Sequence, residues 1–503
     1  MRSISQFLTL SVVAVATNAL KFAVLSDMHL QPYYDPNIDA QHFCQNYFIK
    51  NKLKLSYQDL ITSSDYAPLG RLLCDPPADL IESFMRRINE TEGQVDVILL
   101  TGDMIGHNLA VNPGVTDKPE LYQKLLEVHS QLGQLLNKYF PNSLVLPTLG
   151  NNDCRYHYQS PYENDKQEYY SYLFETYFLN HTRNNQIKEL SEIQNTFLDG
   201  GYYRVDLSEK ISMLMINTLM YNKNNDPANQ GDQLEDQFAW LEKQFMTAEH
   251  DRKFIISNHI YPGSKQEQIP AKLWHSNYTS DFIEILLKYN DKILLEVSGH
   301  DHISDLRYNH GSKIHQSAKK SLTSGSLNDF NFHNIVIAPG VTSASAQNPG
   351  YALFTVEDQD HISARNLTMV FLPIQKTYNW TSIPQDLSQW PFRTLNFNSF
   401  GLHDLSADSF HELRHRLQKD NKLLLNYLAL KTGFDPNDPI EFQTAIAIHQ
   451  KVATLLTSDL NPYVYFCQMH KNLGHLDYTN CIDDNKPKSK TFQFEPKFKP
   501  LQI

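Results

Sequence analysis

Short hydrophobic runs that end in polar residues recur along the chain. They are rich in valine, isoleucine and leucine and do not alternate strictly with polar positions, which is the pattern of strands covered on both faces. Five such runs cover residues 21–29, 95–103, 143–153, 254–259 and 293–302. Hydrophobic residues at helical spacing lie between them, as in 78–88 and 233–245. Strands that alternate with helices predict an α/β core.

The polar residues at the ends of these runs share one chemistry. In α/β sheets, ligands bind beyond the carboxyl ends of the strands. Carboxylate, amide and imidazole groups together suit hard-to-borderline divalent metals. Seven such groups are too many for one zinc ion, but they suit two ions that share a carboxylate, which can hold a phosphate and activate water. The candidate ligands are Asp27, His29, Asp103, Asn151, His259, His300 and His302.

The pattern changes after about residue 365, where it becomes mostly helical. Ser409 and Glu412 fit a capping box before a hydrophobic helix face. Asp438, Pro439 and Glu441 fit a second helix start, with a cap, a first-turn proline and an acidic third residue. We therefore predict a catalytic domain over residues 20–365 and a mostly helical C-terminal domain over 366–503.

The N-terminus predicts export. Arg2 precedes the hydrophobic run "FLTLSVVAVA" (7–16), and Ala19 supplies a small residue for cleavage, so residues 1–19 fit a signal peptide. The alternative is a buried first helix. No later stretch is long and apolar enough to cross a bilayer. Export to the outside or to a lysosome-like lumen agrees with five glycosylation sequons, at Asn89, Asn180, Asn277, Asn366 and Asn379.

The net charge limits the possible binding partners, and the cysteine content predicts disulfides. A net charge of −12 on 503 residues argues against binding to nucleic acid through phosphate neutralisation. Five cysteines in an exported chain favour disulfides. By proximity in the sequence we expect Cys44–Cys74 and Cys467–Cys481 pairs, which leaves Cys154 unpaired. As a free thiol it is expected to be buried and inert, and the alternative is a zinc-binding or redox role.

The ordered set of ligands resembles the calcineurin-like metallophosphoesterases. The order is Asp27-x-His29, Gly102-Asp103, Gly150-Asn151, His259 and Gly299-His300-x-His302. The stretches "DMHLQPYY" (27–34), "GRLLCDPP" (70–77), "TGDMIGH" (101–107), "INTLMY" (216–221), "DPANQ" (226–230) and "NPGYALFTVE" (348–357) resemble the acid sphingomyelinase-like phosphodiesterases in particular. The similarity covers nearly the whole chain after the predicted signal peptide.

The resemblance implies a four-layer α/β/β/α sandwich and two divalent ions, with zinc expected. Asp27, His29 and His302 would bind one ion, Asn151, His259 and His300 the other, and Asp103 would bridge them. The catalytic sequence follows the signal peptide directly, without the saposin module of acid sphingomyelinase. This is similar to the saposin-free relatives and implies nucleotide or phosphocholine- and sphingomyelin-like phosphodiesters as substrates. We expect a monomer that makes only transient contact with a membrane surface.

Asn152 departs from the family pattern, which has a histidine there, near the leaving group. An amide cannot deliver a proton, so three outcomes stay open. His107 takes the acid role, or the substrates have good leaving groups, or the site turns over slowly. His107 has an alternative role as a structural residue beside the ligands. Asp153, with no histidine to orient, is expected to hydrogen-bond the loop backbone.

The predicted activity is hydrolysis of phosphodiester or phosphoanhydride bonds by metal-activated water, with His107 and Asn152 as the candidate residues near the leaving group. The rival is a pseudoenzyme that binds metal and phosphate with weak or no turnover, and its support is Asn152. A phosphomonoesterase of the purple acid type is disfavoured, because Gly106 stands where that class has a tyrosine.

Overall fold

Two six-stranded sheets form the centre of the computed structural model, which describes residues 19–45, 65–113, 118–229, 233–263, 273–310, 331–358, 361–439 and 441. In the first sheet, β1, β2 and β3 run parallel, and β10, β11 and β12 continue the sheet antiparallel on the other side of β1. Its order is β12 (Arg393–Asn396), β11 (Ile362–Phe371), β10 (Gly350–Asp358), β1 (Leu20–Leu25), β2 (Val97–Leu100) and β3 (Leu144–Pro147).

The second sheet has a parallel centre and an antiparallel strand at each edge. Its order is β4 (Tyr203–Asp206), β5 (Ile211–Met215), β6 (Lys253–Ser257), β7 (Ile293–Ser298), β9 (Asn331–Ile337) and β8 (Asp305–His310). Every residue of β2 and of the neighbouring edge strand β3 is buried. Burial on both faces explains why these strands show hydrophobic runs without alternation.

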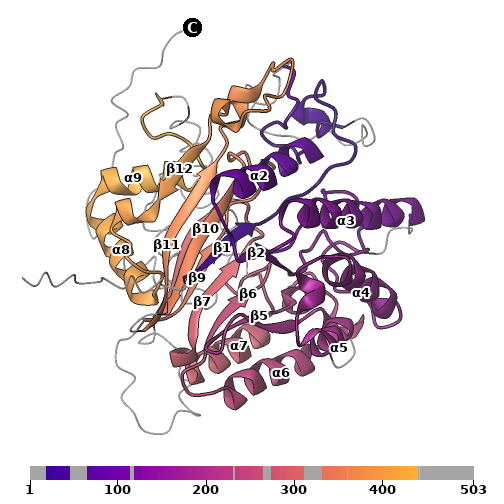
Figure 1. The fold of residues 1–503 in the computed structure, drawn as a ribbon, viewed down its shortest axis with the longest axis vertical. Helices are drawn as coiled ribbons and strands as arrows, with labels where there is room; N and C mark the ends of the chain where they lie inside the picture. The colour runs from indigo at the N-terminus through magenta and orange to yellow at the C-terminus, as the bar shows by residue number, and fades with distance from the viewer. Residues whose placement is uncertain are drawn as a thin grey trace, which may run out of the picture.

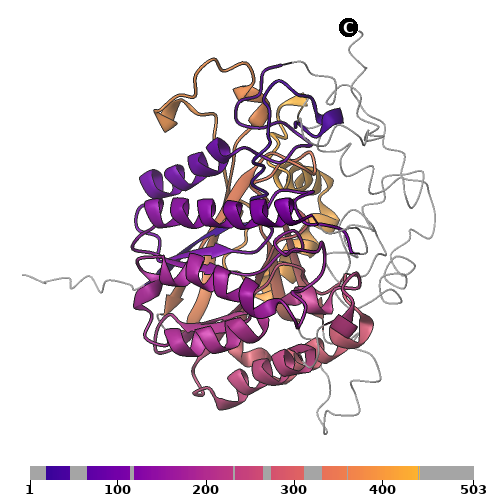
Figure 2. The same cartoon turned by 90° about the vertical axis from the view of Figure 1, so that its right-hand side faces the viewer.

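Helices cover the sheets from both sides, as Figure 1 shows, with α8 and α9 on one side and the other helices on the opposite side and below. Figure 2, turned by 90°, shows α2 and α3 side by side, and the two helices are in contact. The helices are α2 (Ala78–Thr91), α3 (Pro119–Tyr139), α4 (Lys166–Phe174), α5 (Leu190–Gly200), α6 (Gln233–Thr247), α7 (Ser276–Lys288), α8 (Ala407–Lys419) and α9 (Asn421–Leu430). The predicted α/β sandwich and the helices predicted at 78–88 and 233–245 are confirmed.

The carboxyl ends of the two sheets are joined by backbone hydrogen bonds. The loop after β9 passes between β1 of the first sheet and β7 of the second. Its Val341 amide donates to the Ser26 carbonyl and its Ala338 amide to the Ser298 carbonyl, both at 2.9 Å. Because the predicted ligands follow the strands that end at this edge, the loop brings ligands from both sheets to one place.

The C-terminal part differs from the expectation of a helical segment that begins at residue 366. That boundary falls inside β11, and β12 adds a further strand to the first sheet. The predicted cap of α8 is also wrong. Ser406, not Ser409, is the N-cap, and its hydroxyl accepts from the Ser409 amide at 3.2 Å. The second predicted helix start is supported by its cap, because Asp438 accepts from the Glu441 amide at 3.2 Å.

Among the cysteines, the predicted Cys44–Cys74 disulfide is present, with the two Cα atoms 6.1 Å apart. Cys154 forms no disulfide and is buried, as expected. Burial and the adjacent Asp153 charge raise the pKa of its thiol well above the ordinary value, which keeps it protonated. The predicted Cys467–Cys481 pair and most of the signal segment lie outside the described residues. No described helix combines the length and the hydrophobicity that a membrane span requires.

Candidate metal centre

The structure brings all seven predicted ligands together at the carboxyl ends of the strands. They come from the loops after β1, β2, β3, β6 and β7, and none is more than 7% exposed. Their ligand atoms form two groups that share Asp103. One group is Asp27, His29, Asp103 and His302, and the other is Asp103, His259 and His300, with all ligand atoms of a group within 4.8 Å of one another. Asn151 joins the second group, because its Oδ1 lies 3.1 Å from His259 Nε2.

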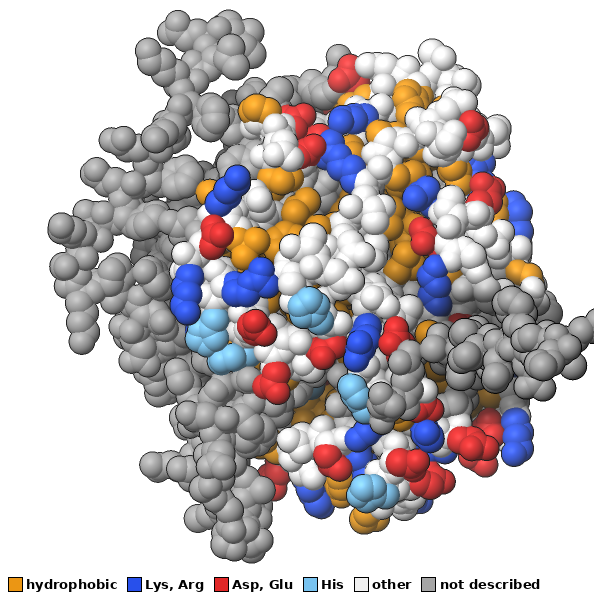
Figure 3. Space-filling model, turned by 60° about the vertical axis from the view of Figure 1, so that its left-hand side comes forward, with side chains coloured by type: hydrophobic (Ala, Val, Ile, Leu, Met, Phe, Trp, Pro, Cys, Tyr) orange, Lys and Arg blue, Asp and Glu red, His pale blue; other side chains and the backbone are white. Residues whose placement is uncertain are grey.

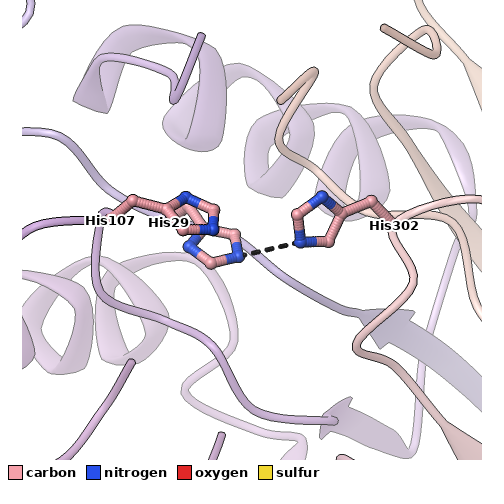
Figure 4. A group of neighbouring side chains, drawn as sticks. All are labelled: His29, His107 and His302. Carbon is pink, nitrogen blue, oxygen red and sulfur yellow. Dashed lines mark hydrogen bonds between the residues drawn. The ribbon is translucent and has the colours of Figure 1, made fainter. Parts of the chain in front are cut away.

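Backbone carbonyls orient two of the histidines toward the centre. His29 Nδ1 lies 3.0 Å from the Ile105 carbonyl, and His259 Nδ1 lies 2.7 Å from the Thr101 carbonyl. Donation from Nδ1–H to these oxygens leaves each Nε2 as the atom that would coordinate a metal, the arrangement that metal-binding histidines use. The Nε2 atoms of His29 and His302 lie 3.1 Å apart and face each other (Figure 4). Two such nitrogens repel unless a proton or a cation lies beside them.

Asp103 lies between the two groups. Its Oδ2 is 3.4 Å from His29 Nε2 and 3.3 Å from His259 Nε2. Burial would raise the pKa of this carboxyl, but the nearby histidines, together with the Asn152 backbone amide, hold it well below its usual range. Asp103 is therefore ionised and in the position of a bridging ligand.

Asp27 adds a second carboxylate to the same buried space. Burial raises its pKa to about 7, against the lowering effect of His259 and with a contribution from the Asp103 charge. Burial alone would lower the pKa of His259, but the Asp103 and Asp27 carboxylates raise it to about 9. Two carboxylates that repel each other and a histidine that attracts a proton are the electrostatic conditions in which a divalent cation is stabilised. The donor set therefore fits divalent metal ions.

The loops that carry the ligands hold unusual backbone conformations. Asp27, His29, Asp103, His300 and His302 all have positive φ, between 43° and 76°. Non-glycine residues adopt this left-handed region at an energetic cost, and such strain is concentrated at functional sites. Close approach of the loops adds a further constraint, because a Cβ on Gly150 would lie 2.1 Å from the Asp103 amide nitrogen.

His107, the predicted leaving-group residue, stacks on a ligand. Its ring lies over His29, with centroids 4.0 Å apart (Figure 4). Asp75 accepts both from the His107 backbone amide at 2.7 Å and from Nδ1 at 2.9 Å. Burial would raise the pKa of Asp75, but His107 holds it below the usual range, so the carboxylate is ionised. The side chain of His107 is 37% exposed, and its Nδ1 is bonded to Asp75.

Asn152 and Asp153 both support the loops of the site. Asn152 donates to the two oxygens of Asp103, from its backbone amide and from Nδ2, each at 2.8 Å. Asp153 accepts from four backbone amides, those of Gly150, Asp103, Met104 and Ile105. The expectation that Asp153 bonds loop backbone is confirmed. Asn152 thus orients the shared carboxylate rather than pointing away from the centre.

Three residues beside the ligands were not assigned roles from the sequence. Asp75 lies in the stretch 70–77 and holds His107. His157 Nε2 lies 3.2 Å from Asn151 Nδ2, so it turns the amide oxygen toward His259. Ser345 Oγ lies 3.0 Å from His302 Nδ1. The sequence gives no direct signal for these contacts. Two of them join loops that are distant in the chain, and the third fixes the orientation of a single side-chain amide.

An ionic network connects the centre to the C-terminal helices. Asp301, between two ligands, accepts from the Tyr261 hydroxyl and lies 3.8 Å from Arg307. Arg307 also lies 3.6 Å from Asp305, and Lys431, just after α9, lies 3.3 Å from Asp305. All five side chains are at most 2% exposed. The loop that carries His300 and His302 is therefore packed against charges from a distant part of the chain.

The comparisons with known proteins agree with this geometry. The chain is similar to sphingomyelinase phosphodiesterase D of Dictyostelium discoideum, with 24% identity over 84% of this chain and 91% of the relative. It is similar to human acid sphingomyelinase-like phosphodiesterase 3b, with 24% identity over 81% and 82% of the two chains. Bovine cyclic GMP-AMP phosphodiesterase SMPDL3A is 26% identical over 82% and 84%.

A family model described as calcineurin-like phosphoesterase matches residues 20–304, which contain all seven predicted ligands. The match covers more than half of the chain, and it begins and ends with the strands and loops that form the buried site. The chain therefore belongs to the calcineurin-like phosphoesterase family.

Proposed function

We propose that the chain is an exported phosphodiesterase that hydrolyses phosphodiester or phosphoanhydride bonds with the help of two divalent metal ions, most simply zinc. The observation that carries the proposal is the pair of buried ligand groups that share Asp103. Asp27, His29 and His302 would hold one ion, and Asn151, His259 and His300 the other. When bound, such ions polarise a phosphoryl oxygen and acidify water so that it becomes a nucleophile near neutral pH.

The residues of the chain supply orientation and proton transfer. Asn152 and Asp153 fix the bridging carboxylate and its loop. The Asp75 carboxylate accepts from His107 Nδ1, which leaves Nε2 as the other ring nitrogen of a partly exposed side chain. His107 Nε2 is thus the atom that would hold the proton for the leaving group, in place of the family histidine that Asn152 replaces.

The relatives guide the choice of substrate class. Their names refer to sphingomyelin-type lipids and to a cyclic dinucleotide, and both contain phosphodiesters. We propose nucleotide or phosphocholine-type diesters for this chain. The relatives described above are all named as phosphodiesterases, so nothing in the comparisons favours the pseudoenzyme alternative. Asn152 has a structural role at Asp103, which gives its presence a reason other than loss of activity.

Export is supported by the positions of the sequons. All five asparagines, Asn89, Asn180, Asn277, Asn366 and Asn379, are exposed. The predicted signal segment and the Cys44–Cys74 disulfide agree with an oxidising compartment. A chain made in a eukaryotic host should leave the cell and lose mass on enzymatic deglycosylation, by electrophoresis or mass spectrometry. Retention in the cytosol with an unmodified mass would contradict export.

Metal removal tests the centre directly. The native chain should contain two divalent ions by elemental analysis and hydrolyse bis(4-nitrophenyl) phosphate. A chelator should remove both ions and the activity, and zinc should restore them. Asp103→Asn should lower the metal content and the activity, because it removes the shared charge. His250→Gln, at an exposed position, is the matched control and should change neither. A metal-free chain that remains fully active would contradict the proposal.

The leaving group distinguishes an acid role of His107 from a structural one. His107→Gln should lower kcat by about 10²–10⁴-fold for a diester with an alkoxide leaving group, because that group needs a proton. The loss should be much smaller for a 4-nitrophenolate leaving group. Steady-state kinetics on both substrates make the measurement, with metal content checked in parallel. Equal losses on the two substrates would assign His107 a structural role instead.

Restoring the family residue tests the meaning of Asn152. Asn152→His should change kcat on a diester with an alkoxide leaving group by less than the roughly 10²-fold that a new general acid adds. The reason is that the substitution removes the Asn152 Nδ2 bond to Asp103 while another residue already carries the proton. A gain of several orders of magnitude from a near-zero baseline would instead favour the pseudoenzyme.

A further inference from the structure

The helix α8 carries the sequence His411-Glu412-Leu413-Arg414-His415. On a helix, residues four apart lie on the same face, and two histidines at this spacing are a recurrent zinc-binding arrangement. The same short pattern also occurs by chance, so its meaning depends on the structural context. The side of the molecule with α8 and α9 comes forward in Figure 3, where histidine side chains are visible at the surface among acidic and basic ones.

The two imidazoles are placed as a chelating pair. His411 Nε2 and His415 Nε2 lie 2.9 Å apart. With zinc–nitrogen bonds of about 2.0–2.1 Å, two ligands at octahedral or tetrahedral angles lie roughly 2.9–3.4 Å from each other. The Nε2 atoms of His29 and His302, in the candidate metal centre, are 3.1 Å apart. The pair on α8 therefore repeats the spacing found between two predicted ligands.

A buried hydroxyl fixes the orientation of the first histidine. Tyr308, on β8, is buried, and its oxygen lies 2.9 Å from His411 Nδ1. If Nδ1–H donates to this oxygen, Nε2 carries the lone pair, as in metal-ligating histidines that are oriented by a neighbouring acceptor. Arg414 also donates to the Tyr308 oxygen, at 3.3 Å, so the hydroxyl itself is held in place. The helix α8 packs on β8 and β9, which places His411 beside Tyr308.

The pair is accessible and distinct from the centre around Asp103. His415 is exposed and His411 half-buried, and neither belongs to the groups that contain Asp103. Within the described part of the chain, no third histidine, cysteine or carboxylate joins these two in a cluster. Two imidazoles are enough to bind an ion, and we assign the pair no peptidase chemistry, which uses a third protein ligand.

We propose that His411 and His415 bind one divalent transition-metal ion, such as Zn²⁺, Ni²⁺ or Cu²⁺, at a site separate from the phosphoesterase centre. Imidazole nitrogens suit these ions and not Mg²⁺ or Ca²⁺. The site does not depend on the proposed function, since neither histidine contacts a predicted ligand of the centre.

Metal titration of the whole chain tests the site. The chain is first loaded with Zn²⁺ and dialysed until elemental analysis finds two zinc ions per chain, so that the site on α8 starts empty. Calorimetric titration with Ni²⁺ should then show one further ion per chain. His411→Gln and His415→Gln should each abolish this uptake and leave the activity on bis(4-nitrophenyl) phosphate unchanged. Tyr308→Phe should weaken it by about 10–100-fold, as loss of an orienting partner does.

His403→Gln, at another exposed histidine, is the matched control and should keep the additional ion. Electron paramagnetic resonance of bound Cu²⁺ gives a second readout, because coupling to two nitrogens should appear in the parent chain and disappear in the His415 variant. The proposal is overturned if the loaded parent chain takes up no further Ni²⁺, or if both histidine variants bind it with undiminished affinity.

Discussion

The structure depends on the burial of two carboxylates, Asp27 and Asp103, at the ends of adjacent parallel strands. Two negative charges in a space that excludes water repel each other, and the cost of removing them from water is large. Burial and the repulsion from Asp103 raise the pKa of Asp27, whereas the nearby histidines lower the pKa of Asp103. Positive charge at the centre resolves it. The surrounding imidazoles, the amide of Asn151 and the donors of Asn152 are arranged as a shell for such charge.

The backbone accepts strain so that this shell can form. Several ligand residues adopt left-handed conformations that cost free energy. The cost is offset by the hydrophobic strands below them and by the bonds that the loop after β9 makes to both sheets. Asp153 adds to this support, since one side chain accepts from the backbone of two ligand loops. The site is therefore a property of the whole sandwich and not of any one loop.

Much of the fold and the predicted ligand set could be recognised from the sequence, because the signals are local. Hydrophobic runs mark the strands, and the polar residues that follow them mark the edge where ligands gather. The position of β11 could not be read in this way. Its pairing with β10 and β12 is a long-range contact in a segment that otherwise has a helical pattern. The cap of α8 was misplaced by three residues for a related reason, since several serines and acids compete for the same helix end.

The roles of side chains near the ligands were harder to predict than the ligands themselves. Asp75 and His107 are far apart in sequence, and only the folded loops place them in contact. His157 is close to Asn151 in sequence, but its effect on one amide depends on how the intervening turn closes. The pattern that identifies a metal-binding loop thus leaves open which neighbouring group carries a proton and which one orients a ligand.

The ionic network between Asp301, Arg307, Asp305 and Lys431 has a consequence for biosynthesis. The chain emerges from the ribosome with its N-terminus first, so the loop with His300 and His302 is synthesised before Lys431. Until then the two carboxylates of the network, Asp301 and Asp305, have Arg307 beside them but not Lys431. The loop with the two histidines therefore gains its full set of buried ionic contacts only when the residue that follows α9 has been synthesised.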